Sequence, residues 1–129
     1  MEGSLKELAE YRMKRAEEML LAAEGNLEIG QYKTSLNRSY YAIFHAMRAA
    51  NIVKGFDSSK HSGVIAFFNK TFLKEDILDR NLSVIVKNSS FLREKSDYDD
   101  FFIAGRQEAE KQIEDAKIFL TAVENWLKE

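Results

Sequence analysis

The residues most capable of chemistry in this sequence lie close together between positions 37 and 48. Arg38 and His45 are seven residues apart, so on a helix, which turns about 100° per residue, their directions differ by only about 20°. Tyr41 and Arg48 fall on the same stripe. An arginine holds a phosphate through two parallel hydrogen bonds, a histidine transfers protons near neutral pH, and a tyrosine stacks on an unpaired base. The stripe therefore predicts a surface that binds RNA and could cleave it without a metal.

The same stripe also admits a structural interpretation. His45 can satisfy a hydrogen bond in the core, Arg38 can pair with an acid from another helix, and Tyr41 can simply pack. Three hypotheses therefore stay open: a module that binds RNA or a nucleotide, a metal-independent endoribonuclease, and an interaction protein whose polar cluster only fixes helix register. The enzyme hypothesis assigns catalysis to His45 with either Arg38 or Arg93.

A second group of polar residues lies between positions 93 and 98. Arg93 and Asp97 are four residues apart, so both face one direction if the helix extends that far. The pair is either an ordinary surface ion pair or part of a polar cluster in which Asp97 or Glu94 meets Arg38 across the bundle. We count Arg93 and Asp97 as candidate catalytic residues and the adjacent Tyr98 as a candidate RNA contact.

A third candidate, Lys60 and His61, stands at the start of a predicted helix. The N-terminus of a helix attracts anions, and a lysine with a histidine adds to that attraction. These two residues are therefore a candidate phosphate contact. The alternative is a solvated segment that only caps the helix.

The elements that must position these residues are predicted to be helices. Proline is absent and only six glycines occur, which disfavours the many turns of a β-protein. Apolar residues recur at helical spacing, and we expect helices over residues 4–28, 32–53, 62–72, 76–95 and 105–127, with a structured loop over 96–102. The apolar stripe of the second helix is predicted to be core, and Phe91 of the fourth is predicted to point inward. The chain is thus expected to be an all-α, up-and-down bundle of four or five helices in a single domain over residues 1–129.

Composition narrows the range of functions. Without cysteine, and with only two histidines, the chain has neither a disulfide nor the ligands for a tetrahedral zinc site, so we expect no metal and no cofactor. No apolar run approaches the roughly 18 residues of a membrane span, and the charged N-terminal segment is unlike a signal peptide, so we expect a cytoplasmic protein with no membrane partner. The net charge of −2 means that an RNA-binding surface must be a local patch.

Three segments in this order resemble the HEPN domain family. They are NRSYYAIFHAMRA at residues 37–49, KHSGVI at 60–65 and LREKSDYDDF at 92–101, and the likeness spans roughly residues 5–127. It is closest to the small, stand-alone prokaryotic branch. The resemblance implies a helical bundle that is usually dimeric and commonly encoded beside a minimal nucleotidyltransferase, in a toxin–antitoxin or two-component system. It also implies a possible metal-independent ribonuclease, whose family motif is an arginine, four to six residues, a histidine and then a tyrosine.

The sequence departs from that motif on the fourth predicted helix. Arg93 is present there, but Asp97 and Tyr98 stand where the family has a histidine; the arrangement of an arginine, six residues and a histidine occurs instead from Arg38 to His45. An aspartate is a poor acid at neutral pH, so RNA or nucleotide binding is the function the resemblance supports first. In related pairs the nucleotidyltransferase modifies a tyrosine of its HEPN partner, and Tyr98 is the analogous position.

A homodimer is a separate expectation. The outer faces of the first and last predicted helices are mostly polar, so the interface is expected on the helix over 32–53, on residues 96–102, or on both. The aromatic candidates for this interface are Tyr98, Phe101 and Phe102.

Overall fold

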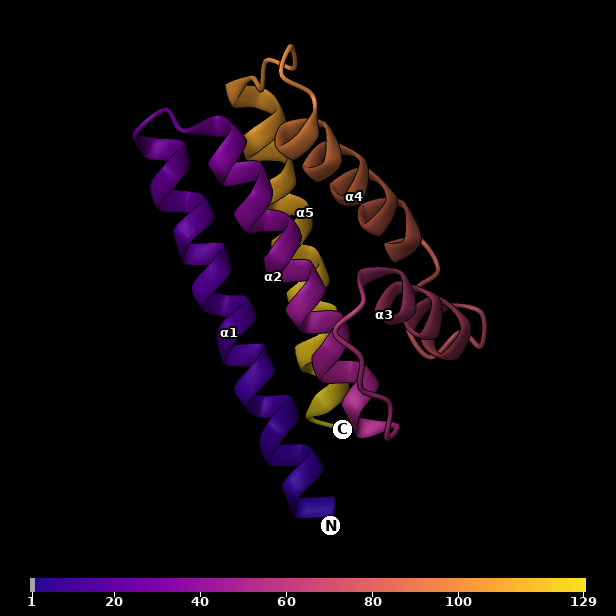
Figure 1. The fold of residues 1–129 in the computed structure, drawn as a ribbon. Coiled ribbons are helices and arrows are strands. Elements are labelled where there is room, and N and C mark those ends of the chain that lie inside the picture. The colour runs from indigo at the N-terminus through magenta and orange to yellow at the C-terminus, as the bar shows by residue number, and fades with distance from the viewer. Residues whose placement is uncertain (1) are drawn as a thin grey trace.

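Three long helices set the shape of the molecule in the computed structural model, which describes residues 2–129. α1 (Glu2–Glu28), α2 (Tyr32–Val53) and α5 (Arg106–Leu127) run alongside one another, and α2 packs against both of the others (Figure 1). The chain ends of α1 and α5 lie at the same end of the bundle (Figure 1). α2 is therefore the helix through which the rest of the molecule is connected.

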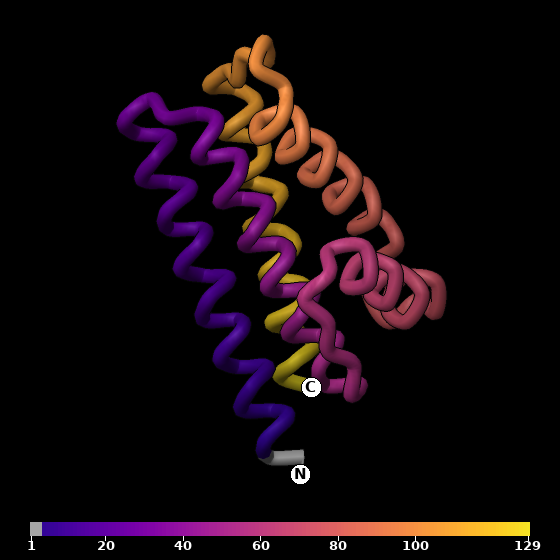
Figure 2. Tube along the Cα trace, in the orientation of Figure 1, coloured from indigo at the N-terminus to yellow at the C-terminus, as the bar shows by residue number. Residues whose placement is uncertain are grey.

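Two shorter helices cover the remaining side of α2. α3 (His61–Phe68) continues into a short π-helix, η1 (Asn69–Leu73). α4 (Leu82–Tyr98) then runs back along α2 toward the start of α5. The trace of the chain shows this excursion between α2 and α5 (Figure 2). The described residues contain no strand, and the predicted all-α bundle of five helices is confirmed.

The core is built around α2. Its predicted apolar stripe is buried, with all four members no more than 2% exposed: Leu36, Tyr40, Ile43 and Met47. The alanines on the neighbouring face are fully buried as well (Ala42, Ala46, Ala49 and Ala50), and their small side chains let the backbone of a second helix approach closely. The stripe prediction is therefore confirmed, and it identifies α2 as the central helix.

Two glycines end the first two helices. Gly30 and Gly55 adopt positive φ angles of 78° and 82°, a conformation that glycine takes without the steric cost of a Cβ. The bounds predicted for the second helix agree with those of α2. The start predicted for the first helix, at residue 4, is wrong, because α1 already begins at Glu2 and Ser4 lies inside it.

The beginning of α4 also differs from its prediction. The helix starts at Leu82 instead of Asp76, because Asp76 adopts a φ of 57° that breaks the helical path. The carboxylate of Asp79 then accepts a hydrogen bond from the Asn81 backbone N–H at 2.9 Å, which forms a turn just before the helix. Phe91, predicted to be buried, is 59% exposed.

The other end of α4 runs further than predicted. The helix reaches Tyr98, so residues 96–98 of the predicted loop are helical. Ion pairs at i and i+4 span this last turn, Arg93 with Asp97 and Lys95 with Asp99. Such pairs stabilise a helical turn by a few tenths of a kcal/mol, about 0.2–0.5 each. Among the described residues, no helix is long and apolar enough to span a membrane.

Candidate functional site

Five side chains from three helices meet on the side of α2 that faces α3 and α4. They are Tyr40, Tyr41 and Phe44 of α2, His61 at the start of α3 and Arg93 of α4, and we call them the aromatic cluster. The Tyr40 hydroxyl and His61 Nδ1 share a hydrogen bond of 2.7 Å. The His61 ring stacks on Phe44 with 4.3 Å between the ring centroids. The guanidinium of Arg93 lies 4.7 Å from the centroid of the Tyr40 ring, a cation–π contact.

Burial keeps both partners of the Tyr40–His61 hydrogen bond neutral at pH 7. Burial raises the pKa of Tyr40 to about 12, although the charge of Arg93 opposes the rise. Burial, and then the positive charge of Arg93, lower the pKa of His61. Since the bond uses Nδ1, Nε2 is the ring nitrogen of His61 that remains for a ligand.

Arg93 is held in place with only part of its hydrogen-bonding capacity used. Its Nη1 donates to Asp97 Oδ2 at 3.4 Å, and its buried Nε has no hydrogen-bond partner among the described residues. Asp97 also accepts hydrogen bonds from the Asn37 amide, at 3.4 Å to each carboxylate oxygen. The prediction that Arg93 and Asp97 face the same direction is confirmed. The predicted contact of Asp97 with Arg38 is not found, because Asp97 contacts α2 at Asn37 instead.

A second cluster lies where α1, α2 and the connector after α2 meet. Arg12 of α1 donates from Nη2 to Asp57 Oδ2 at 3.1 Å, and its Nη1 lies 3.1 Å from Oδ1. Arg48 of α2 donates from Nη2 to Asp57 Oδ1 at 2.9 Å. We call Arg12, Arg48 and Asp57 the arginine cluster. Hydrogen bonds from Arg12 and then from Arg48 lower the pKa of Asp57, so its carboxylate is charged at neutral pH.

His45 links the two clusters. Its ring centroid lies 6.3 Å from that of Tyr41 and 5.9 Å from that of Phe44. Burial, followed by the charges of Arg15, Arg48 and Arg12, lowers the pKa of His45 to about 4. At pH 7 this imidazole is therefore neutral, and it can accept a proton or a hydrogen bond but carries no charge for a phosphate.

The other predicted residues lie in different surroundings. Arg38 is half-buried and points its Nη1 at Met19 Sδ of α1, at 3.7 Å, and no contact among the described residues joins it to His45. Lys60 is the exposed residue that precedes α3, and its backbone N–H donates to Ser58 Oγ at 3.1 Å. Tyr98 is 75% exposed at the end of α4. The structure therefore places the Tyr41 ring against the rings of His61 and His45. Arg48 belongs to the arginine cluster, and the side chains of Arg38 and Lys60 make no described contact with the aromatic cluster.

Sequence reasoning missed Arg12, Asp57 and the packing role of Phe44. A signal for Arg12 was present, because it lies at helical spacing with Ala9 and Ala16, which are buried at 1% and 0% exposure. A charged side chain on the inward face of a helix marks a buried ion pair or a ligand contact. Asp57 gave no comparable signal, since it lies in a polar connector without periodicity.

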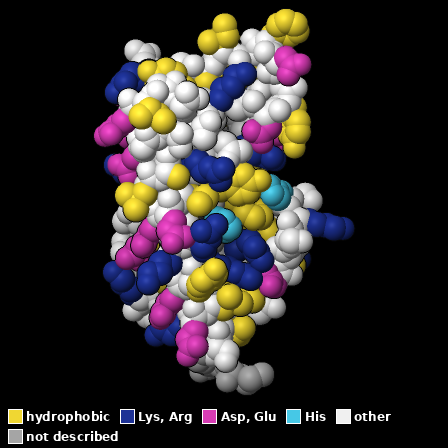
Figure 3. Space-filling model, turned by 60° about the vertical axis from the view of Figure 1, so that its left-hand side comes forward, with side chains coloured by type: hydrophobic (Ala, Val, Ile, Leu, Met, Phe, Trp, Pro, Cys, Tyr) yellow, Lys and Arg dark blue, Asp and Glu magenta, His cyan; other side chains and the backbone are white. Residues whose placement is uncertain are grey.

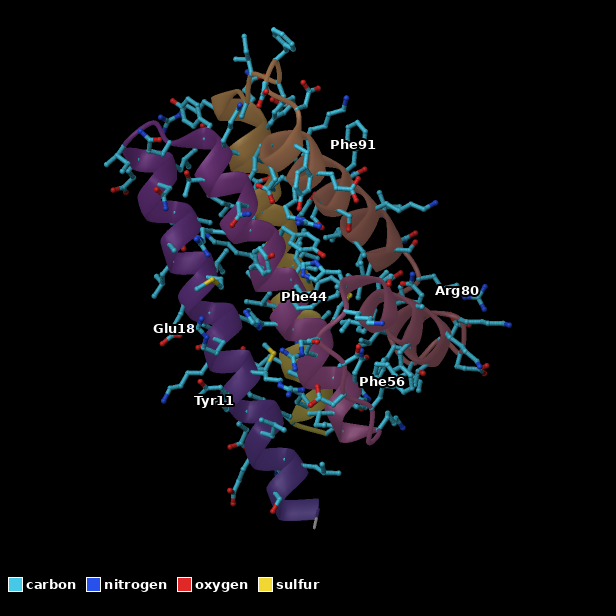
Figure 4. All side chains as sticks on the ribbon, viewed as in Figure 1. Tyr11, Glu18, Phe44, Phe56, Arg80 and Phe91 are labelled. Carbon is cyan, nitrogen blue, oxygen red and sulfur yellow. The ribbon has the colours of Figure 1, made fainter. Side chains whose placement is uncertain are left out.

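These clusters occupy one continuous face. Figure 3 shows both imidazoles side by side on this face, bordered by Lys and Arg side chains and by exposed hydrophobic ones. In Figure 4 Phe44 points from α2 into the space between α2, α3 and α4, whereas Arg80 lies at the far end of the connection between α3 and α4. A local basic and aromatic patch therefore exists on a chain whose net charge is −2.

Comparison with known proteins identifies the family of the chain. The family model of the HEPN domain matches residues 9–126. The chain belongs to the HEPN domain family. A relative in Methanocaldococcus jannaschii, named "Putative toxin MJ0605", is 36% identical over 114 residues, which cover 88% of this chain and 84% of that protein.

Other members of the HEPN family lie in distant prokaryotes. A protein of Thermotoga maritima named "UPF0332 protein" is 31% identical over 122 residues, covering 95% of this chain and 92% of that protein. Among solved structures, the crystal structure of TT1696 from Thermus thermophilus matches with a TM-score of 0.77 and 22% identity, covering 92% of this chain and 97% of that one. At that identity the structural likeness concerns the fold alone.

Proposed function

We propose that this HEPN-domain protein binds single-stranded RNA on the face formed by the aromatic cluster and the arginine cluster. The observation that carries the proposal is the convergence of His61, Arg93 and the α2 aromatics, which come from three helices far apart in the sequence. Tyr41 and His61 are partly exposed, whereas Tyr40 and Phe44 are buried and support them. Unpaired bases stack on exposed aromatic rings, and guanidinium groups hold the phosphates between them. Protein surfaces that bind single strands combine these two features.

The biological role we propose is that of the toxin-side member of a two-component system in the cytoplasm. Support comes from the names of two relatives in M. jannaschii, "Putative toxin MJ0605" and "Putative toxin MJ0142". A minimal nucleotidyltransferase is the partner that the family resemblance suggests. Tyr98 is the residue we assign to that partner, because its ring is 75% exposed and its hydroxyl is accessible to a modifying enzyme.

We further propose that the chain forms a homodimer through the exposed apolar side chains at the end of α4 and in the loop that follows. Phe101 and Ile103 are 94% and 86% exposed, and Phe91 on the preceding helix is 59% exposed. Apolar side chains gathered on a surface mark interaction sites. Sedimentation of the purified protein at micromolar concentration tests this: a dimer is expected, and a monomer there would contradict it.

A second candidate function is metal-independent cleavage of RNA. The observation that favours it is that His61 and Arg93 both contact Tyr40, although no histidine follows Arg93 in the sequence. His61 hydrogen-bonds to the Tyr40 hydroxyl at 2.7 Å, and the Arg93 guanidinium lies 4.7 Å from the centroid of the Tyr40 ring. His61 Nε2 would take the proton of the 2′-hydroxyl as its oxygen bonds to phosphorus, and Arg93 would stabilise the negative charge that develops on the phosphate. The bond from phosphorus to the 5′-oxygen would then break, which leaves a 2′,3′-cyclic phosphate, and the protonated imidazole would return the proton to the leaving oxygen. Tyr40 would hold the imidazole in position through Nδ1.

The binding proposal is tested with a fluorescent single-stranded RNA and the variant Arg93→Gln. Loss of a charge-assisted contact to phosphate costs about 1.5–3 kcal/mol, so affinity is expected to fall at least about tenfold. Arg80→Gln is the matched control, because Arg80 also pairs with an aspartate four residues away, at 2.9 Å, but lies outside the face. Arg80→Gln is expected to change affinity less than about twofold. Equal losses in the two variants would refute the proposed surface.

The same RNA separates binding from cleavage. The protein is incubated with it in EDTA, and the products are examined for a 2′,3′-cyclic phosphate end. Cleavage that disappears in His61→Asn while RNA binding persists would establish the ribonuclease. Binding without cleavage at any protein concentration would leave the binding module as the function.

A further inference from the structure

We propose that Arg12 and Arg48 form a phosphoryl-binding site in which the Asp57 carboxylate occupies the place of the phosphate until a ligand displaces it. The inference deepens the proposed function, because on the RNA-binding face it assigns one phosphate to named residues. It does not depend on RNA alone, since a free phosphoryl compound presents the same oxygens.

The geometry around Asp57 is that of a bound oxoanion. Two guanidinium groups from different helices surround one carboxylate, with nitrogen–oxygen distances of 3.1, 3.1 and 2.9 Å. Arginine forks recognise carboxylates and phosphates with the same spacing of donors. The site is therefore built for an anion with several oxygens, whichever group supplies them.

The two arginines are held in place, whereas the Asp57 carboxylate can move away from them. The side chain of Arg12 is only 10% exposed and that of Arg48 only 22%, and both project from long helices. Asp57 lies in the connector between α2 and α3, and its side chain is 48% exposed. Movement of a connector residue disturbs no helix, whereas the two arginines stay in position when the carboxylate moves away.

A carboxylate leaves part of the site unsatisfied. Arg48 Nε is buried and makes no hydrogen bond within the described part of the chain, and Arg12 Nη1 lies 3.1 Å from Asp57 Oδ1 without making a hydrogen bond to it. Two guanidinium charges face one carboxylate charge, so a net positive charge remains at the site. A terminal phosphate carries more negative charge and three acceptor oxygens. A phosphodiester of RNA carries a single negative charge, but its tetrahedral oxygens can still reach donors that a flat carboxylate leaves unused.

The arginine cluster also adjoins the aromatic cluster. His45 lies one helical turn before Arg48 on α2, and its ring centroid is 6.3 Å from that of Tyr41. A nucleotide whose phosphate replaces Asp57 would thus place its base toward the partly exposed ring of Tyr41. This contiguity favours a phosphoryl ligand attached to a base over an isolated acidic group.

The test uses pyrophosphate as the probe and the variant Asp57→Asn. This variant removes the charge of the Asp57 carboxylate that competes with the ligand, so its affinity for pyrophosphate is expected to be at least about tenfold higher than that of the natural sequence. The affinity is measured by titration calorimetry and by 31P line broadening. Arg48→Gln is expected to abolish binding. Glu24→Gln is the matched control, because Glu24 is a similarly exposed acid that joins two helices through Lys117 at 3.4 Å. It is expected to leave pyrophosphate binding unchanged.

Unchanged or weaker binding in Asp57→Asn would overturn the proposal and leave the cluster as an ion pair that anchors the connector. If Asp57→Asn is poorly folded, pyrophosphate binding is compared between the natural sequence and Arg48→Gln. Binding that is absent from both proteins, or equal in both, overturns the site.

A competition experiment separates the two sources of the phosphate. Single-stranded RNA that displaces pyrophosphate would place the site on the RNA-binding path. RNA that binds without displacing it would assign the site to a free phosphoryl compound, and pyrophosphate binding without any RNA binding would refute the proposed function alone.

Discussion

The aromatic cluster and the arginine cluster stand on the same helix but are held together by different forces. In the aromatic cluster, rings pack on rings, Tyr40 is 1% exposed, and a neutral hydrogen bond of 2.7 Å joins two helices. In the arginine cluster, charge holds the parts together, and its acid comes from a half-exposed connector. Packing cannot be exchanged for a ligand without opening the core, whereas a carboxylate can be exchanged for another anion.

This difference assigns the two clusters different tasks. The aromatic cluster is a fixed platform that orients His61 and Arg93 before any ligand arrives, and preorganisation of that kind lowers the entropic cost of binding. In the arginine cluster, the Asp57 carboxylate already occupies the place proposed for a phosphate. Three changes test this contrast, and we take them from the largest expected effect to the smallest.

Asp57→Ala should produce the largest change in stability. It leaves the nearly buried charge of Arg12 without an anion, and breaking a buried ion pair costs about 3–5 kcal/mol. Because Asp57 is half exposed, we expect a smaller loss of about 2 kcal/mol in the free energy of unfolding, measured with urea. Glu24→Ala, which breaks an exposed pair, should cost less than about 0.5 kcal/mol. Equal losses would show that the arginine cluster is an ordinary surface ion pair.

The pH dependence of stability tests the surroundings of His45. Its pKa is about 4 in the folded protein and about 6.5 when unfolded, so the unfolded chain binds more protons between these values. Stability is thus fully present above pH 6.5 and is lost as the pH falls toward 4. Allowing for partial exposure, we expect His45 to contribute about 1 kcal/mol of the loss between pH 7 and pH 5.

His45→Gln should remove that part of the pH dependence. Urea unfolding of both proteins at pH 7 and pH 5 gives the comparison. His61, whose pKa is also lowered, contributes a loss of the same sign in both proteins, so the difference between them reports His45. An unchanged pH dependence in His45→Gln would mean that neither burial nor the arginines lower the pKa of this imidazole.

Tyr40→Phe should produce the smallest of the three effects. The ring and its packing remain, and only the hydroxyl that bonds to His61 is lost, so the expected cost is between about 0.5 and 1 kcal/mol. Tyr41→Phe is the neighbouring control, since the structure describes no hydrogen bond from its hydroxyl, and its free energy of unfolding should stay within about 0.5 kcal/mol. A loss above about 2 kcal/mol in Tyr40→Phe would contradict a cluster held mainly by packing.

The local features of the fold could be predicted from the sequence, and the reason is physical. The bounds of α2 follow from helical periodicity that ends near Gly30 and Gly55, and these signals lie within a few residues. The start of α4 could not be predicted in the same way. It depends on a left-handed Asp76 and on the turn at Asp79, and the apolar residues around them continue the helical spacing without a break.

Less of the candidate site could be predicted, because its contacts join residues far apart in the sequence. Spacing puts Tyr41, His45 and Arg48 along one side of α2, and that much follows from 3.6 residues per turn. Arg12 and Asp57 are 45 positions apart in the sequence and Tyr40 and His61 are 21 apart, and only the way the helices cross brings each pair together. A single sequence shows which residues share one face of a helix, but it does not show the angles at which helices cross. The residues that contact α2 were therefore known only from the structure.

The central claim is that RNA binds on the face that carries both histidines, and the chain offers a direct test because it has only two. The imidazole signals of His45 and His61 can be assigned in a 1H–15N spectrum with His45→Gln and His61→Asn, and then followed while single-stranded RNA is added. We predict that both signals shift in proportion to the bound fraction, with His61 moving more because its Nε2 meets the ligand. RNA that binds while both signals stay unchanged would contradict the account.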